Sequence, residues 1–396
     1  MKKIIWLCAF SNDELAEKLP LLTNPKTVSP WMSEFVDLFR NNLNFKIYII
    51  SPNYLNNTNI NLCIGNIDVY LYKFYPCFLS EKFYNLTLNY NLTNRNVSKL
   101  VQEINPDLIH LFGAENPVYS SAIVNNRFNC PILVSPQAFI RNSSLAGSLI
   151  KRFIRWNRIR FESKILKEQK YFTVATNDVV DELNKTNPES IKFKMAYPTT
   201  FGEPFQDLIS DNQEFDISYF AQISKEKGIE DFLELVVRLK QKFSNIRAVI
   251  IGGGNELYIK QIKRQLINHG LSENIYFAGF QKTQKEAFNL LRKSKVYVLP
   301  TFHDGLPGTI REAMYLKVAV VAYGVGGIPS LNDKSECIKC VPVHSLDLLL
   351  IEVISLLKDE QYRSQLINNA YRVITQDFNN ENVYSDLVNI YNKILK

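Results

Sequence analysis

Short apolar runs alternate with amphipathic stretches along the whole chain. Runs rich in β-branched and aromatic residues are typical of buried strands, whereas apolar residues three and four positions apart are typical of helices that bury one face. In the first half the pattern predicts strands at Lys3–Phe10, Phe45–Ser51, Asp68–Tyr75, Asp107–Phe112, Ile132–Ser135 and Tyr171–Ala175. In the second half it predicts strands at Phe215–Phe220, Ala248–Ile251, Ile275–Ala278, Lys295–Leu299, Val318–Ala322 and Cys337–Val341. Strands that alternate with helices indicate an α/β fold with mostly parallel, doubly wound sheets.

The length of 396 residues and one polar interruption predict two domains. Pro198, Gly202 and Pro204 punctuate a polar stretch that ends near Asn212, which is typical of a linker. We therefore expect one Rossmann-like domain in residues 1–200, a linker in 201–213 and a second Rossmann-like domain in 214–375. Two such domains would face a central cleft, and ligands of these sheets bind at the carboxyl ends of the strands.

The stretch VYVLPTFHDGLPGTIREAM, residues 296–314, predicts the chemistry of the second domain. It begins as a strand, passes through a loop that contains glycine and proline, and restarts as a helix near Thr309. This arrangement aims backbone N–H groups and the positive end of a helix at an anion, usually a phosphate. Asp304 and Glu312 bracket the turn, and ionised carboxylates accept hydrogen bonds from sugar hydroxyls. The pattern favours a nucleotide sugar, although an ordinary βα turn with two solvated acids would have the same local sequence.

The segments HDGLPGTIREAM and VAVVAYGVGGIP resemble the carboxyl-terminal signature of the family 4 retaining glycosyltransferases. The segments YFAQISKEKGIEDFLELVVRLK and AVIIGGG are similar to the family's two preceding strand–helix units, so the resemblance covers Phe215 to about Lys358. The first half matches more loosely, through DLIHLFGAENP and ILVSPQAFI. The resemblance implies a GT-B fold, a first domain that binds the acceptor, and a last helix, 376–396, that packs back on this domain. It also implies sugar transfer with retention of configuration and without a bound metal.

The resemblance also assigns roles to single residues. A lysine before a glycine at a helix start can reach a diphosphate, and Lys227 matches the family's lysine for the leaving group, while Gln222 replaces its arginine partner. Asp304, where the family usually has glutamate, would contact the donor sugar, and Glu312 would bind the ribose diol. The full implied donor site is Gln222, Lys227, Gly254, Phe280, Asp304, Gly305, Leu306, Pro307, Gly308, Thr309, Glu312 and Gly326.

The first domain offers a candidate catalytic histidine. His110 lies at the carboxyl end of a predicted strand, where active-site residues of such sheets collect. The family places its catalytic histidine two residues later, and that position is Phe112 here. Either His110 substitutes or the domain uses another polar group, such as Glu115, and a packed core histidine is the alternative. The predicted catalytic set is His110, Lys227, Asp304 and Glu312.

The net charge of +7 is concentrated in one predicted helix. Residues 151–170 contain eight Lys or Arg and two Glu, a net charge of +6. We expect most cations to lie opposite an apolar stripe, with Trp156 and Ile159 off it; the stripe consists of Leu149, Ile150, Phe153, Ile154, Phe161 and Ile165. The helix is then either a core helix with a solvated basic face or a contact, through Lys151–Lys170, with a membrane surface or a lipid-linked acceptor. Nucleic acid is not expected, because no recognised binding fold accompanies the charge.

Other features limit the class of protein. No apolar run reaches the roughly 18 residues of a membrane-spanning helix, and MKKIIWLCAF is interpreted as a first core strand rather than a signal peptide. We expect a cytoplasmic protein, or one peripheral on the inner face of the cell membrane. Six scattered cysteines argue against a disulfide scaffold, and Cys337 and Cys340 lack further ligands nearby, so no metal site is expected.

Together these features predict a retaining glycosyltransferase of bacterial-type surface polysaccharide synthesis (capsule, O-antigen or lipopolysaccharide). Its substrates would be a UDP- or GDP-sugar and a glycan or lipid-linked acceptor, with no other cofactor. Two alternatives remain open. One is a nucleotide-sugar epimerase on the same fold, and the other is a non-catalytic partner subunit, which the departures at Gln222, Phe112 and Asp304 would suit.

Overall fold

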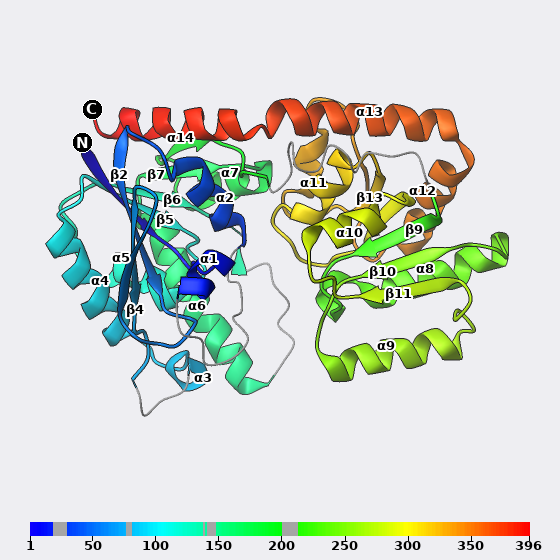
Figure 1. Cartoon of the computed structure of the whole chain (residues 1–396), viewed down its shortest axis with the longest axis horizontal. Coiled ribbons are helices and arrows are strands. Elements are labelled where there is room, and N and C mark those ends of the chain that lie inside the picture. The colour runs from blue at the N-terminus through cyan, green and yellow to red at the C-terminus, as the bar shows by residue number, and fades with distance from the viewer. Residues whose placement is uncertain (19–29, 77–80, 138, 141–147, 200–212) are drawn as a thin grey trace. The chain divides into compact units, whose positions relative to one another are not determined.

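The computed structural model describes residues 1–18, 30–76, 81–137, 139–140, 148–199 and 213–396 (Figure 1). The chain divides into two compact units. Unit 1 comprises Met1–Pro198 with Asn380–Lys396, and unit 2 comprises Thr199–Asn379. The predicted linker, 201–213, lies outside the described residues except for its last position. The predicted fold class, two doubly wound α/β domains, is confirmed by the two sheets.

The described part of unit 1 contains an eight-stranded sheet in the order β3-β4-β2-β1-β5-β6-β7-β8. All neighbours are parallel except β3 and β4. The strands are β1 (Lys2–Leu7), β2 (Phe45–Pro52), β3 (Ile60–Ile64), β4 (Ile67–Tyr72), β5 (Leu108–Phe112), β6 (Ile132–Ser135), β7 (Tyr171–Val174) and β8 (Ile191–Lys194). The helices are α1 (Asp13–Lys18), α2 (Pro30–Phe39), α3 (Glu81–Tyr84), α4 (Asn91–Ile104), α5 (Pro117–Asn125), α6 (Leu149–Glu168), α7 (Asn177–Thr186) and α14 (Asn380–Ile394).

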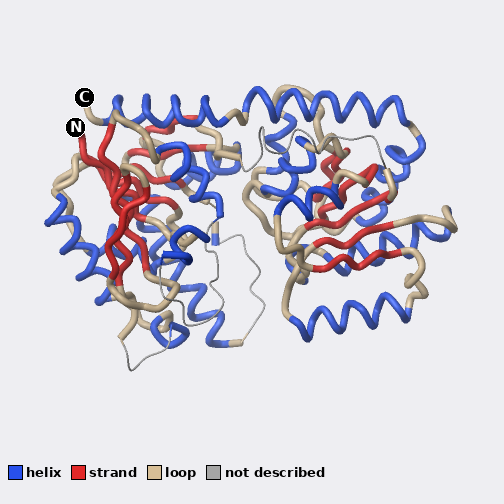
Figure 2. The backbone as a smooth tube through the Cα atoms, viewed as in Figure 1, coloured by secondary structure: helices blue, strands red, loops and turns tan. Residues whose placement is uncertain are grey.

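The described part of unit 2 contains a six-stranded, fully parallel sheet in the order β11-β10-β9-β12-β13-β14. Its strands are β9 (Phe215–Phe220), β10 (Ala248–Ile251), β11 (Ile275–Gly279), β12 (Ser294–Leu299), β13 (Ala319–Tyr323) and β14 (Lys339–Val341). Its helices are α8 (Ile229–Lys242), α9 (Glu256–Asn268), α10 (Gln284–Leu291), α11 (Gly308–Tyr315), α12 (Leu346–Lys358) and α13 (Glu360–Asp377), with 3₁₀ turns η3 (Lys225–Lys227) and η4 (Ile328–Asn332). In each unit the strands lie between helices (Figure 2).

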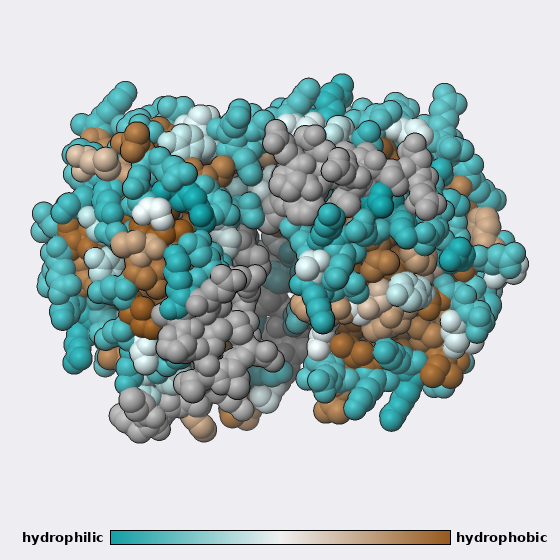
Figure 3. All heavy atoms as spheres, in the orientation of Figure 1, coloured by the Kyte–Doolittle hydropathy of each residue, from teal (hydrophilic) through white to brown (hydrophobic). Residues whose placement is uncertain are grey.

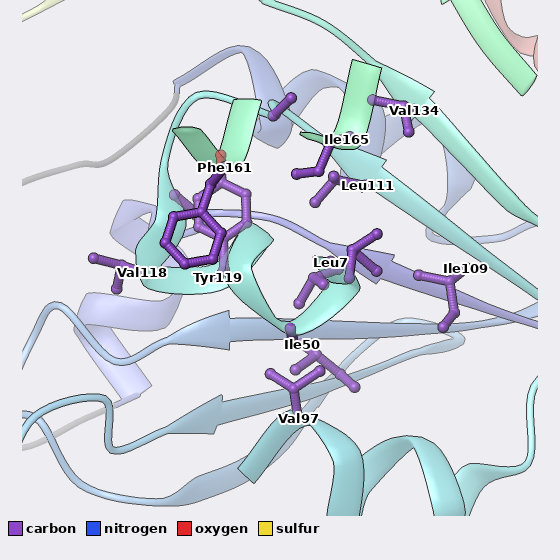
Figure 4. Packing of buried hydrophobic residues seen from close by; sticks show 14 of the residues in the cluster. Leu7, Ile50, Val97, Ile109, Leu111, Val118, Tyr119, Val134, Phe161 and Ile165 are labelled. Atoms are coloured by element: carbon purple, nitrogen blue, oxygen red, sulfur yellow. The ribbon is translucent and has the colours of Figure 1, made fainter. Parts of the chain in front are cut away.

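Both faces of each sheet are covered, which explains the continuous apolar runs. In β1, Ile5 and Leu7 are fully buried in one cluster, while Ile4 and Trp6 are fully buried in another. Successive side chains of a strand point to opposite faces, so a strand that is apolar at every position needs helices on both. Figure 4 shows Leu7 among buried residues of neighbouring strands and of helices α4, α5 and α6.

The last helix belongs to unit 1 although unit 2 precedes it in the chain. Its Tyr391 is buried, and Trp6 Nε1 donates a hydrogen bond of 2.8 Å to Tyr391 Oη. The preceding helix, α13, packs on α11 in unit 2. Figure 1 shows α14, in red, along the upper side of unit 1. The chain therefore leaves unit 1, builds unit 2 and returns.

Two strands were not predicted, and both are edge strands. Of the strands that the structure describes, β3 pairs only with β4, through a two-residue turn in which Gly65 has a φ of 55°. Its exposed and buried positions alternate, so its apolar run is broken. The strand β8 is four residues long and has no fully buried position. Edge strands with one covered face carry a weaker apolar signal than central parallel strands.

The predicted apolar stripe of α6 is only partly correct. Phe161 and Ile165 are buried in the core, as Figure 4 shows. Leu149, Ile150 and Phe153, which were placed on the same stripe, are exposed. Only part of this 20-residue helix packs against α5 and α7, so the apolar side chains of its first turns stay exposed.

The molecular surface drawn in Figure 3 is largely hydrophilic, and its apolar residues lie in scattered groups. Within the described ranges, we find no helix that combines the length and the apolar character needed to cross a bilayer.

Candidate functional site

Loops from four strands of unit 2 meet at one edge of its sheet. Parallel strands end at the same edge, so the loops after β9, β10, β12 and β13 are brought together. Main-chain contacts link them in pairs: Ile223 forms a bridge with Gly254, Phe302 N donates to Glu226 O (2.9 Å), and Gly327 N donates to Gly305 O (2.8 Å). The loops therefore form one connected backbone surface.

Two glycines allow this close approach. Gly228 has a φ of 72°, and a Cβ at this position would lie 1.8 Å from Pro300 O. Gly326 has a φ of 52°, and a Cβ there would lie 2.0 Å from Asp304 O. Any other residue would meet both backbone strain and a steric clash. These glycines hold the β9 and β13 loops against the loop that carries Asp304.

Lys227 and Asp304 form an ion pair across this surface, between Nζ and Oδ2. Lys227 belongs to η3, whose Ser224 Oγ accepts a hydrogen bond from Lys227 N (3.3 Å). Asp304 follows β12, and its Oδ1 accepts from Gly305 N (3.1 Å). Their side chains are 27% and 17% exposed, so the pair is held in place but remains reachable from solvent.

Glu312 lies on α11, the helix that follows the loop with Asp304. The buried Tyr297 has its Oη 2.8 Å from Phe220 O and 2.9 Å from Thr309 Oγ1. Burial raises the pKa of Tyr297 well above its usual value, and the negative charges of Glu312 and Asp304 both add to the rise. Through Thr309, three positions before Glu312, Tyr297 connects β12 to the helix that carries Glu312. Glu312 also accepts a hydrogen bond from Gln284 Nε2 (3.3 Å).

The helix α11 begins beside these acids. Pro307 is its N-cap, and no side chain among the described residues caps the helix start. Gly308, the first helical residue, is exposed. The first amides of a helix carry partial positive charge and lack partners within the helix. The start of α11 thus offers hydrogen-bond donors to an anion, next to carboxylates that can accept from hydroxyls.

The remaining predicted donor residues lie on the β10 and β11 side of the same edge. Gly252 N donates to Gly279 O (2.8 Å), which joins the loop holding Gly254 to the strand end before Phe280. The Phe280 ring is 76% exposed, as a side chain that stacks on a ligand would be. Gln222 is exposed and brings no charge. The structure thus gathers the predicted donor residues at one sheet edge; their roles stay predictions.

His110 does not join this set, because it lies in the core of unit 1. It is 0% exposed, its Nδ1 is 2.7 Å from Tyr391 Oη, and its Nε2 is 2.7 Å from Ser135 Oγ. Burial lowers the pKa of His110 well below 6.5. Both ring nitrogens are engaged and no substrate can reach them. The predicted catalytic role of His110 is therefore wrong, and Phe112, which packs against Trp6 at 5.5 Å, is equally a core residue.

Glu115, the other polar group considered in this segment, is a better candidate than His110 for a functional group of unit 1. It lies in the loop between β5 and α5, and its backbone carbonyl accepts from Arg158 Nε (2.8 Å). Its Oε2 is buried and has no hydrogen-bond partner among the described residues. Burial raises the pKa of Glu115, and Arg158 opposes the rise only in part.

Two residues that support the helix carrying Glu312, or contact Glu312 itself, were not predicted. Tyr297 looked like an ordinary apolar strand residue, yet its hydroxyl joins β9 to α11. Gln284 follows Thr283, whose capping box with Glu286 starts α10. The capping pattern T-x-x-E was available in the sequence and would have placed Gln284 at the first position of that helix.

Possible metal ligands are dispersed. Within the described ranges, no group of three or more His, Cys, Asp or Glu side chains is arranged to hold a metal ion. Cys337 is buried and Cys340 partly buried, and burial raises the pKa of both thiols.

Comparison with known proteins gives the site its context. Residues 202–373 match the family model of the glycosyl transferases group 1. Over 203 residues the chain is 23% identical to the capsular polysaccharide biosynthesis glycosyltransferase CapM of Staphylococcus aureus, covering 49% of this chain and 50% of that protein. The chain thus spans about half the length of the curated relatives it matches.

Two solved structures share the fold over the whole chain. Sucrose-phosphate synthase from Thermosynechococcus elongatus superposes with a TM-score of 0.74 at 13% identity, covering 100% of this chain and 99% of that one. HepE of Anabaena, solved in complex with UDP, has a TM-score of 0.68 at 14% identity, covering 99% and 100%. The predicted glycosyltransferase resemblance is confirmed at this level. The chain therefore has the GT-B fold, and its residues 202–373 are similar to the group 1 glycosyl transferases.

Proposed function

We propose that the protein is a retaining glycosyltransferase that moves a sugar from a UDP- or GDP-sugar to a glycan or lipid-linked acceptor of a surface polysaccharide, without a bound metal ion. The observation that carries the proposal is the site at the edge of the unit 2 sheet. There the Lys227–Asp304 ion pair, the start of α11 and Glu312 combine a cation, amide donors and two carboxylates. A nucleotide sugar carries the complementary groups, a diphosphate and several hydroxyls.

The ion pair suits both ends of such a donor. Lys227 would bind the diphosphate, and Asp304 would accept hydrogen bonds from the sugar hydroxyls. Each residue holds the other in place, so little conformational entropy is lost when the donor binds. Glu312 would accept from the two ribose hydroxyls, and Phe280 would stack on the base.

Transfer would depend on stabilising the leaving diphosphate. Negative charge develops on this group as the bond to the sugar breaks, and Lys227 with the amides of α11 would neutralise it. Gln222 supplies no charge, so Lys227 is the cation in this loop that the mechanism depends on. The family's retention of configuration predicts a product with the anomeric configuration of the donor, which NMR of the product measures.

The acceptor class rests on the relatives. The matched protein of S. aureus is named for capsular polysaccharide biosynthesis, and HepE was solved with UDP. These names support a surface glycan as product and UDP-sugar as the first donor to test. Glu115 in unit 1 is the polar group that we propose lies nearest to the acceptor hydroxyl, in place of His110.

A thermal-shift screen with UDP-, GDP-, ADP- and CMP-sugars tests donor binding. A ligand at 100 times its Kd stabilises the protein by about 2.7 kcal/mol, so the correct donor should raise the Tm clearly. Lys227→Ala should abolish the shift, because the diphosphate loses its cation. Lys225→Ala is the matched control: it removes the same charge from the exposed neighbour in η3 and should keep the shift.

An undiminished shift in Lys227→Ala would remove the role assigned to this lysine. Donor binding without transfer to any acceptor would instead favour the non-catalytic subunit, and interconversion of the free nucleotide sugar would favour the epimerase.

A further inference from the structure

The first two turns of α6 expose a group of large apolar side chains. Leu149, Ile150, Phe153 and Trp156 are 80%, 48%, 37% and 52% exposed, and we call them the α6 patch. The rings of Phe153 and Trp156 lie 5.6 Å apart, so the group is continuous. Single exposed apolar residues are ordinary on protein surfaces, whereas a contiguous group indicates an interaction site.

The neighbouring segment extends the patch. Asn157 Nδ2, on α6, donates to Thr87 O (2.8 Å), and Arg160 donates to Leu88 O. These bonds hold the loop after α3 beside the helix. The Leu88 side chain in that loop is also exposed. The patch therefore has a second chain segment at its border.

Cations border the patch. Arg152 is exposed on α6 one position before Phe153, whereas Lys151 is exposed on the other side of the helix. The Arg160 guanidinium lies 5.7 Å from the centre of the Trp156 ring. A partner must therefore accept large apolar side chains and positive charge over the same few turns of helix.

An anionic lipid surface has this combination. Its phosphates and acidic headgroups lie next to the acyl chains, so apolar side chains enter the boundary while Lys and Arg stay at headgroup level. Tryptophan is also favoured at this depth. The charge of the whole segment 151–170, +6, adds long-range attraction to such a surface.

We infer that the α6 patch docks the protein on an anionic lipid bilayer, with the first two turns of α6 at the interface. The sequence left two interpretations open, a solvated basic face and a membrane contact through Lys151–Lys170. The exposed apolar side chains favour a contact at the first two turns of the helix. This docking goes beyond the proposed sugar transfer and does not depend on it, because it uses none of the donor-site residues.

Vesicle flotation of the full chain tests the inference. We expect binding to phosphatidylcholine vesicles that contain 30% phosphatidylglycerol and little binding to pure phosphatidylcholine. Leu149→Asp combined with Phe153→Asp should lower the fraction bound about tenfold or more, because charged side chains do not enter the acyl boundary. Both residues are exposed, so the Tm should stay within a few degrees of that of the wild type.

The helix α9 supplies the matched control. It also exposes two apolar residues, Leu257 and Ile267, beside cations, but they lie ten positions apart. Leu257→Asp combined with Ile267→Asp should leave vesicle binding unchanged. If this variant loses binding and the α6 variant keeps it, the docking surface is not the α6 patch and the inference is wrong.

Fluorescence provides a second readout. Trp156 is exposed and lies in the patch, so we expect a blue shift on vesicle binding that is lost or strongly reduced in Trp156→Phe, which keeps the other two tryptophans. A wild type that fails to bind anionic vesicles would overturn the inference. So would a dimer in sedimentation that the α6 variant dissociates, because the patch would then bind a second copy. Donor-induced thermal shifts are measured separately, so failure of this inference is distinguishable from failure of the proposed function.

Discussion

The pairing of Lys227 with Asp304 gives the candidate site its most specific feature. The two residues are 77 positions apart in the chain, so the backbones of their two loops must bring them together. Gly228 provides that support for Lys227, since it lets the β9 loop lie against Pro300. A lysine is a flexible point charge, so its usefulness for a diphosphate depends on where this loop holds it.

Gly228→Ala is predicted to destabilise unit 2 and to weaken donor binding. The change adds left-handed backbone strain of about 1–2 kcal/mol and a Cβ that must displace Pro300. Gly270→Ala separates the two effects, because its φ is 65° but no atom lies within 4 Å of the added Cβ. Urea unfolding should show a clearly larger loss for Gly228→Ala, and equal losses would mean that the close approach to Pro300 has no energetic weight.

At the scale of elements, α14 completes the core of unit 1 from the far end of the chain. Its Tyr391 hydroxyl accepts from Trp6 Nε1 and lies 2.7 Å from His110 Nδ1. One buried hydroxyl therefore satisfies two buried ring nitrogens from β1 and β5. Buried polar groups of this kind are costly when left unpaired, so the helix contributes through hydrogen bonding as well as apolar packing.

Tyr391→Phe should lower the free energy of unfolding of unit 1 by about 1–3 kcal/mol, because Trp6 and His110 each lose a partner inside the core. Tyr384→Phe is the control on the same helix. Among the described residues its hydroxyl bonds only the exposed Asn44, at 3.0 Å, and its loss should cost about 0.5 kcal/mol or less. Denaturant titration of the two variants measures the difference, and similar losses would contradict the role given to Tyr391.

At the scale of the whole molecule, the chain forms two cores that share no residue. The clusters of unit 1 include α14, whereas those of unit 2 contain residues between Phe215 and Ile374. Each sheet is covered on both faces by helices of its own unit. The loops of the proposed donor site belong to unit 2.

Calorimetry of the full chain is expected to show two unfolding transitions. A donor nucleotide sugar should raise only the transition of unit 2, since a ligand stabilises the state that binds it. Tyr391→Phe should lower only the transition of unit 1. A single transition that moves with both changes would show instead that the units unfold together.

Much of this architecture followed from local pattern. The strands of unit 2 were predicted within a residue or two, because most of them are rich in β-branched and aromatic residues and are followed by glycine or proline. The donor loop was predicted for the same reason, since strand, glycine-containing loop and helix follow one another directly from Val296 to Met314. The strands β3 and β8 were not predicted, because polar residues interrupt the apolar residues in both.

The sequence alone determined the features that depend on residues within a few positions of each other. These are the succession of strands and helices, the loop glycines and the two acids around one turn. The burial of His110, its partner Tyr391 at 281 positions' distance, and the exposure of the first turns of α6 depend on segments that meet only after folding. Periodicity predicts which face of a helix is apolar. It does not predict how much of that face is buried, because burial depends on the packing of elements that are distant in the sequence.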